Sequence, residues 1–177
     1  MMRAVQIEIR RLNAADARAH LSELASVLVD CVEGGASVSF MPPFTQSDAE
    51  AFFRKVATGV EAGERILLAA FHDSELVGTV QLLTAMPPNQ PHRAEVAKML
   101  VMRWARSRGI GEALMRRAEE CALEAGKTLL VLDTVQGGAA ERLYARLGWN
   151  QAGVIPKYAL MPDGSWCDTV IFWKSLA

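Results

Sequence analysis

"RSRGIGEALM", residues 106–115, sets two arginines and two glycines directly before a predicted amphipathic helix. Gly109 and Gly111 lack a Cβ atom where the chain enters that helix, so several backbone N–H groups can turn toward one anion at the positive end of the helix dipole. Arg106 and Arg108 can add charge-assisted hydrogen bonds. The stretch by itself indicates either a phosphate site or a plain tight turn with surface arginines, because short glycine patterns have low specificity.

Two common nucleotide-binding motifs do not fit this loop. A P-loop requires Gly-Lys-Ser or Gly-Lys-Thr, and a dinucleotide-binding turn requires Gly-x-Gly-x-x-Gly followed by an acidic residue at the end of the next strand. Residues 106–115 match neither pattern. The surrounding elements therefore have to decide between a phosphate site and a turn.

Predicted strands and helices alternate along the chain, which indicates an α/β fold without internal repeats or linkers. Apolar alternation or short apolar runs predict strands at 5–12, 65–72, 75–84, 93–102, 128–134 and 169–176. Helical spacing predicts helices at 15–32, at 109–125, at 139–149, and from a cap at Ser47 or Asp48 to about Ala62. We expect residues 1–177 to form one domain.

Composition limits the classes of partner. The formal charge of −1, from 19 basic and 20 acidic residues, gives no overall basic field for nucleic acid or an anionic membrane. The three cysteines are odd in number and form no metal-ligand pattern, so we expect neither disulfides nor a metal site. The chain shows no export signal and no run of apolar residues long enough to span a bilayer, which favours the cytoplasm.

The pattern Arg/Gln-x-x-Gly-x-Gly, here Arg106, Gly109 and Gly111 after a strand with "KMLVM", resembles the GCN5-related N-acetyltransferase (GNAT) family. The resemblance implies a mixed sheet of six to seven strands flanked by about four helices, with two splayed central strands that bind acetyl-CoA. In this family, the backbone amides of the glycine-containing loop would hold the pyrophosphate of acetyl-CoA, and the backbone of the preceding strand would hold the pantetheine arm. The positions implied for the arm are Met99, Leu100, Val101 and Met102, and those for the pyrophosphate are Arg106, Ser107, Arg108, Gly109, Ile110 and Gly111.

Three further stretches, "GGASVSFM", "NQPHRAEVAKMLV" and "YALMPDG", resemble the tabtoxin-resistance branch of that family, which acetylates a toxin derived from a β-lactam dipeptide. Two positions depart from the wider family pattern. Arg103 stands where a proline commonly follows the cofactor strand, and Gly137 stands where an asparagine often precedes the fourth helix.

Acetyl transfer needs a group that accepts the acceptor's proton and an acid that protonates the departing thiolate. Tyr144 stands where the family carries the tyrosine that approaches the CoA sulfur. An ordinary phenol, with a pKa near ~10, can protonate a thiolate whose thiol has a pKa near ~8.5. The alternative is a core tyrosine whose hydroxyl reaches the surface.

Glu95 and Asp133 are the candidate proton acceptors, either directly or through water. Glu95 and Val101 share a face if their strand is unbroken, whereas a bulge between them reverses that parity. A surface ion pair with Arg93 or Lys98 is the alternative for Glu95. Asp133 ends a buried strand, at the edge where α/β proteins commonly place their sites, or it simply bonds to turn amides there.

Two loops are expected to border the acceptor. Residues 34–44 combine two flexible glycines with apolar side chains that either cover a small ligand or fill the core, and residues 158–166 form a turn. His92 is a further candidate base or an ordinary loop histidine. The residues that we expect on the acceptor side are Ser37, Phe40, Met41, His92 and Asp163.

These observations predict an acyltransferase that moves the acetyl group of acetyl-CoA directly to an amine or hydroxyl of a small molecule. The narrower resemblance implies a toxin-like or antibiotic-like amino-acid or β-lactam acceptor, and hence a role in resistance. Two alternatives stay open, namely acetylation of a protein N-terminus or lysine, and a regulator that binds acyl-CoA without turnover. The chain is expected to be a monomer or a homodimer.

Overall fold

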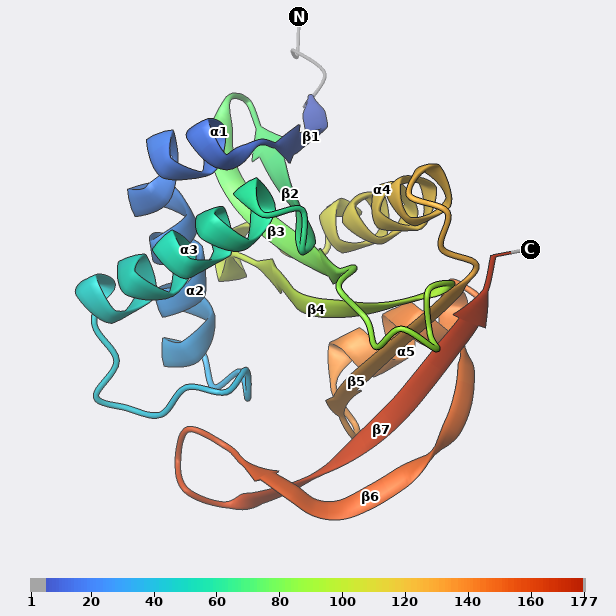
Figure 1. Ribbon diagram of the computed structural model, residues 1–177. Coiled ribbons are helices and arrows are strands. Elements are labelled where there is room, and N and C mark those ends of the chain that lie inside the picture. The colour runs from blue at the N-terminus through green and yellow to red at the C-terminus, as the bar shows by residue number, and fades with distance from the viewer. Residues whose placement is uncertain (1–5, 177) are drawn as a thin grey trace, which may run out of the picture.

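The computed structural model describes residues 6–176, whose strands form one seven-stranded sheet in the order β1-β2-β3-β4-β5-β7-β6 (Figure 1). Only β4 and β5 pair in parallel, and every other neighbouring pair is antiparallel. The strands are β1 (Ile7–Leu12), β2 (Arg65–His72), β3 (Glu75–Leu83), β4 (Arg93–Val101), β5 (Leu129–Val135), β6 (Asn150–Leu160) and β7 (Trp166–Ser175). The expected mixed α/β sheet is confirmed.

Helices cover both faces of this sheet (Figure 1). They are α1 (Ala14–Ala19), α2 (Leu21–Glu33), α3 (Gln46–Glu61), α4 (Ile110–Glu124) and α5 (Ala139–Arg146), with a short 3-10 turn η1 at Arg103–Ala105. One buried cluster lies between the sheet and α1–α3, and a second lies between the sheet and α4–α5. Among residues 6–176, no helix combines the length and apolarity that a bilayer crossing requires.

The strands β4 and β5 diverge after a short parallel stretch. Their pairing runs only from Arg93 opposite Leu129 to Glu95 opposite Val131, although both strands continue beyond it. Against β3, β4 contains a bulge, because its register shifts between Thr79 and Gln81 while Lys98 adopts φ 53°. The splayed central strands implied by the family resemblance are therefore present.

This bulge reverses the side-chain parity expected for an unbroken strand. Ala94 and Val96 belong to the core beneath α4, so Glu95, which lies between them, faces the opposite side. After the bulge, Leu100 faces the core beneath α2 and α3, and Val101 packs on the α4 side. Glu95 and Val101 consequently lie on opposite faces.

The structure corrects several predicted boundaries. The helix predicted over 15–32 is two helices, because the chain breaks at His20 after a short helix capped by Asn13. Thr45 caps α3 in place of Ser47 or Asp48, since its hydroxyl accepts from the Asp48 N–H and the Asp48 carboxylate accepts from the Thr45 N–H. The strand predicted from residue 5 begins at Ile7, and Val5 lies outside the described residues.

The apolar pattern missed β6. None of the residues of β6 is buried, so its sequence lacks the alternation of apolar and polar residues that marks a half-buried strand. It pairs with β7 in a long hairpin that curves beneath the rest of the molecule, with its turn beside the loop that joins α2 and α3 (Figure 1).

The core beneath α4 gives a direct test of the fold. Leu114 is fully buried there, so Leu114→Ala should lower the free energy of unfolding by roughly 2–5 kcal/mol through lost burial and a residual cavity. Leu123→Ala, on the same helix at 49% exposure, is the matched control and should change that free energy much less. Urea denaturation measures both values, and equal losses would contradict this orientation of α4.

Candidate functional site

The amino end of α4 presents a run of free backbone donors. Gly109 is the N-cap residue at φ 79°, and Ser107 is also left-handed at φ 60°. Among residues 6–176, no backbone or side-chain acceptor pairs with the N–H groups from Ser107 through Glu112, and the first helical bond runs from the Ala113 N–H to the Gly109 carbonyl. Such free amides at a helix start suit an anion with several oxygens.

The two arginines of this loop already make contacts within the protein. Arg106 Nε donates to the Val101 carbonyl at 3.0 Å, and its Nη2 lies 3.7 Å from Cys31 Sγ. The Arg108 guanidinium lies over the Trp104 ring, 5.9 Å from its centroid. Arg106 therefore supports the end of β4 and α2, whereas the amides beside it stay free.

Small residues allow the close packing behind the loop. A Cβ atom at Gly111 would lie 3.1 Å from Leu143 Cδ2 and 3.7 Å from the Met99 sulfur, so α4 approaches α5 and β4 closely at this point. The family departure at Arg103 also has a local explanation. Its N–H donates to Asp30 Oδ2 at 2.8 Å, a hydrogen bond that a proline cannot make.

Tyr144 lies on α5 with 5% of its surface exposed, and its ring packs near Trp149 and Phe172. Burial raises the pKa of its phenol well above the ordinary value, and the negative charge of Asp133 raises it further. The phenol therefore keeps its proton throughout the neutral range. Tyr144 is at once a core residue and a protonated group within electrostatic reach of Asp133.

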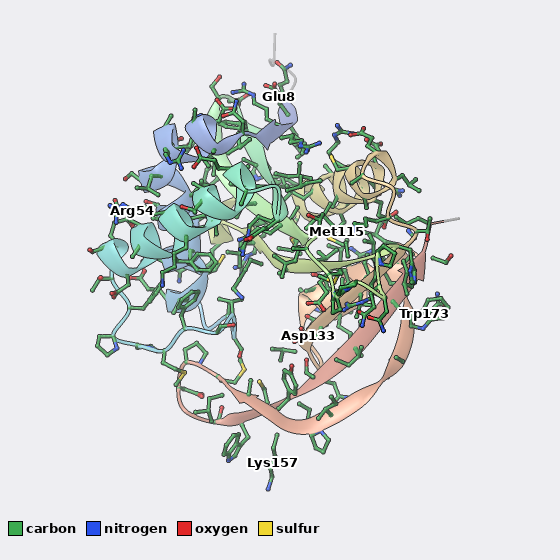
Figure 2. All side chains as sticks on the ribbon, viewed as in Figure 1. Glu8, Arg54, Met115, Asp133, Lys157 and Trp173 are labelled. Atoms are coloured by element: carbon green, nitrogen blue, oxygen red, sulfur yellow. The ribbon has the colours of Figure 1, made fainter. Side chains whose placement is uncertain are left out.

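The two candidate carboxylates lie in different surroundings. Asp133 is exposed at the end of β5, on the inner side of the β6–β7 hairpin (Figure 2), and accepts one long hydrogen bond, 3.3 Å, from Thr169 Oγ1. Glu95 accepts from Arg93 at 2.7 Å, and its side chain is 44% exposed. The ion pair that the sequence allowed for Glu95 therefore forms with Arg93, not with Lys98.

The loop over 34–44 meets the β6–β7 hairpin. Ser37 Oγ donates to the Leu160 carbonyl at 2.8 Å, across 123 positions of sequence. Phe40 stacks on Phe44 and contacts Phe52, so it packs toward the core of α2 and α3, whereas Met41 is 42% exposed. The core-filling alternative therefore describes Phe40, whereas the expectation that Met41 borders the acceptor stays a prediction.

His92 and Asp163, which were also expected on the acceptor side, are both exposed and lie outside the strands. His92 is exposed just before β4, where its carbonyl accepts from the Thr128 and Leu129 N–H groups. At about 3.3 Å per residue, the length of β4 places it roughly 25–30 Å from the loop that follows this strand. Asp163 accepts from the Ser165 N–H and hydroxyl in the hairpin turn.

Lys98 is the residue that the sequence did not single out. It occupies the bulge of β4, and its Nζ donates to Ser39 Oγ at 3.2 Å. Burial lowers the pKa of its ammonium below the ordinary value, while the Asp133 carboxylate acts in the opposite direction. The sequence around Lys98 could not have identified this residue, because a lysine within a predicted strand gives no indication of a left-handed backbone.

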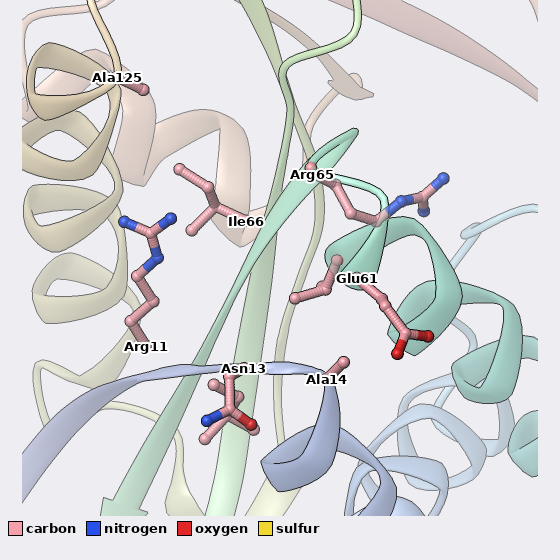
Figure 3. A pocket seen from close by; sticks show the side chains of 10 residues that line it. Arg11, Asn13, Ala14, Glu61, Arg65, Ile66 and Ala125 are labelled. Atoms are coloured by element: carbon pink, nitrogen blue, oxygen red, sulfur yellow. The ribbon is translucent and has the colours of Figure 1, made fainter.

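A cavity of about 510 Å³ lies elsewhere, between the end of β1, the end of α3 and the last turn of α4 (Figure 3). Arg11, Asn13, Glu61, Arg65 and Ile66 are among the residues that line it. It contains none of the residues predicted for the site. The free amides before α4 and the divergence of β4 and β5 define the candidate site instead.

The same fold occurs in solved acetyltransferase structures. An N-acetyltransferase from Staphylococcus aureus Mu50 superposes with a TM-score of 0.81 at 18% identity, covering 97% of this chain and 99% of that one. The protein yncA from Salmonella typhimurium, solved with its cofactor acetyl-CoA, gives 0.77 at 18% identity, covering 97% and 94%. A protein assigned as a phosphinothricin N-acetyltransferase gives 0.77 at 19% identity, covering 97% and 99%.

The sequence itself carries the family assignment. The family model described as "Acetyltransferase (GNAT) family" matches residues 35–149, a range that includes β4, the loop at 106–111, β5 and α5. This match spans well over half of the chain, and the structure supplies the diverging strands and the free helix amides that the family resemblance implied. The chain therefore belongs to the acetyltransferase (GNAT) family, whose members are acetyl-CoA-dependent acyltransferases.

Proposed function

We propose that the protein transfers the acetyl group of acetyl-CoA to the amine of a small molecule of the amino-acid or β-lactam type, in a ternary complex in the cytoplasm. The run of free amides from Ser107 through Glu112, next to the divergence of β4 and β5, is the observation that carries this proposal. A role in resistance to a toxin-like acceptor follows from the narrower resemblance.

The donor is proposed to bind along the loop and the free edge of β4. The amides of Ser107 through Gly111 would hold the pyrophosphate, and the backbone of Met99 through Met102 would hold the pantetheine arm where β5 no longer pairs with β4. Gly111 has a packing role as well, because any side chain there would crowd Leu143 and Met99.

An added charge in the loop tests the donor site. Ser107→Asp should weaken acetyl-CoA binding about tenfold, because a carboxylate beside the free amides repels the pyrophosphate. Aspartate tolerates the left-handed backbone, so the loop should persist. Calorimetric titration measures the affinity, with Ser47→Asp on the exposed start of α3 as the charge-matched control. Equal affinities for all three proteins would exclude this loop as the pyrophosphate site.

The chain's own residues are proposed to move two protons. When bound, acetyl-CoA supplies the thioester that the acceptor nitrogen attacks, so that an N–C bond forms and the C–S bond breaks. Asp133 receives the proton that the nitrogen loses, directly or through water, and the Tyr144 hydroxyl gives its proton to the sulfur. The raised pKa keeps the Tyr144 phenol protonated at neutral pH, but it also makes the phenol a weaker acid. The proton therefore moves while the C–S bond breaks, and the tyrosinate then regains a proton from solvent.

Tyr144→Phe should lower kcat about 10²-fold with an unchanged affinity for acetyl-CoA, because the lost hydroxyl acts mainly in the transition state. Tyr158→Phe is the matched control, since Tyr158 is the other tyrosine of the chain and is 52% exposed on β6. Thiol release with an acceptor that the wild type turns over measures both. An unchanged single-turnover rate in Tyr144→Phe would refute the acid role.

Asp133→Asn should lower kcat about 10²-fold, whereas Glu95→Gln should lower it only a few-fold, because Arg93 already holds the Glu95 carboxylate. Asp73→Asn, in the exposed β2–β3 turn, is the control for loss of a surface carboxylate. The same assay compares all three variants after their acetyl-CoA affinities are shown to match the wild type. A larger loss in Glu95→Gln would transfer the proton-accepting role to that residue.

A small acceptor is favoured by the contact between loop 34–44 and the hairpin. The Ser37–Leu160 hydrogen bond closes one side of the acceptor region, whereas an extended peptide needs an open groove. Turnover of short peptides in preference to free amino acids in the same assay would favour the alternative, acetylation of a protein.

A further inference from the structure

Lys98 holds an unusual backbone conformation for its residue type. Its φ of 53° lies in the left-handed region, where glycine is favoured and a long side chain is strained. The bulge needs one extra residue, but it does not need a lysine. The side chain therefore calls for an explanation beyond the geometry of the strand.

The Lys98 ammonium is under-partnered compared with the other half-buried lysines. Lys127 donates to two carbonyl oxygens, and Lys174 pairs with the Glu119 carboxylate and a carbonyl. Lys98 donates only to the neutral hydroxyl of Ser39, and within residues 6–176 it forms no ion pair. An ammonium has three donors, so it retains capacity for an anionic ligand.

The Lys98 ammonium lies close to Asp133, one of the two groups that are proposed to transfer protons. Lys98 on β4 and Asp133 on β5 both lie just beyond the last paired positions of these strands, Glu95 and Val131. The Asp133 charge also acts to raise the pKa of both Lys98 and Tyr144. Ser39, the partner of Lys98, belongs to the same loop as Ser37, which contacts the hairpin. Lys98 thus lies between the proposed proton-transfer groups and the loop expected to border the acceptor.

We propose that Lys98 determines acceptor specificity by binding a carboxylate of the acceptor, with the Ser39 hydroxyl as a second donor, while the acceptor's amine lies toward Asp133. This inference rests on the proposed acetyl transfer and specifies the substrate class of that site. One cation and one anion that do not pair with each other match the two opposite charges of an amino acid. An acceptor without an anionic group leaves the Lys98 charge uncompensated.

The test compares paired acceptors. Common L-amino acids are each assayed beside their own carboxamide, together with simple monoamines and short peptides, at saturating acetyl-CoA by thiol release. The wild type should prefer the acid over the amide by about 10- to 100-fold in kcat/KM, the range for hydrogen bonds to a charged group. Lys98→Met should bring this ratio close to one, mainly through KM, and Lys98→Arg should retain part of the preference.

Two further variants separate the missing charge from a folding defect. Lys98→Gly removes the ammonium and relaxes the left-handed backbone, so it should match Lys98→Met in the acid-to-amide ratio with an equal or higher melting temperature than the wild type. Lys157→Met is the matched control, because Lys157 is also a lysine at a strand bulge, with φ 52°, and points away from the molecule (Figure 2). It should keep the wild-type ratio.

Other results would contradict either the role of Lys98 or the proposed function. An unchanged ratio in Lys98→Met, or weaker acetyl-CoA binding in Lys98→Met and Lys98→Gly, would remove the assignment to the acceptor carboxylate. A wild type that binds acetyl-CoA and acetylates only amides, monoamines or peptides, or no member of the panel, would also remove it while leaving the donor site intact. A folded wild type that does not bind acetyl-CoA would overturn the proposed function itself.

Discussion

The divergence of β4 and β5 is the constraint on which the site depends. The strands pair over three positions and then separate, so the far half of β4 still pairs with β3 but no longer pairs with β5, inside an otherwise continuous sheet. Unpaired groups at such a place require a hydrogen-bonding partner, whether solvent or a ligand. The bulge at Lys98 and the loop that leads into α4 lie farther along the chain, after this separation.

Contacts between distant segments hold the separated strand in place. Arg106 and Cys31 both donate to the Val101 carbonyl, so the last residue of β4 is connected to α2. Asp30, on the same helix, accepts from the Arg103 N–H and side chain. The arginine that departs from the family pattern thereby adds an anchor, and the loop arginines leave the loop amides free because a guanidinium has no acceptor for an N–H group.

The order of the elements, the helix that follows the loop, and the family were readable from the sequence, because apolar periodicity and the Arg106, Gly109, Gly111 spacing are local signals. Helix caps and β6 were not. Asn13 and Thr45 compete with other polar residues nearby for the capping position, and the exposed residues of β6 lack the alternation that marks a half-buried strand. Tyr144 was identified through the resemblance and Asp133 through its place at the end of a buried strand, but their electrostatic proximity became visible only in the folded chain.

The sequence by itself determined the membership of a fold family and the position of the glycine-containing loop before α4, since both depend on residues a few positions apart. Tertiary structure alone decided that Glu95 and Val101 face opposite sides, that Lys98 meets Ser39, and that Ser37 meets Leu160. These results depend on a bulge whose left-handed residue carries no sequence signature and on contacts across 59 and 123 positions of chain. Such contacts form only when the sheet and its helices are packed together.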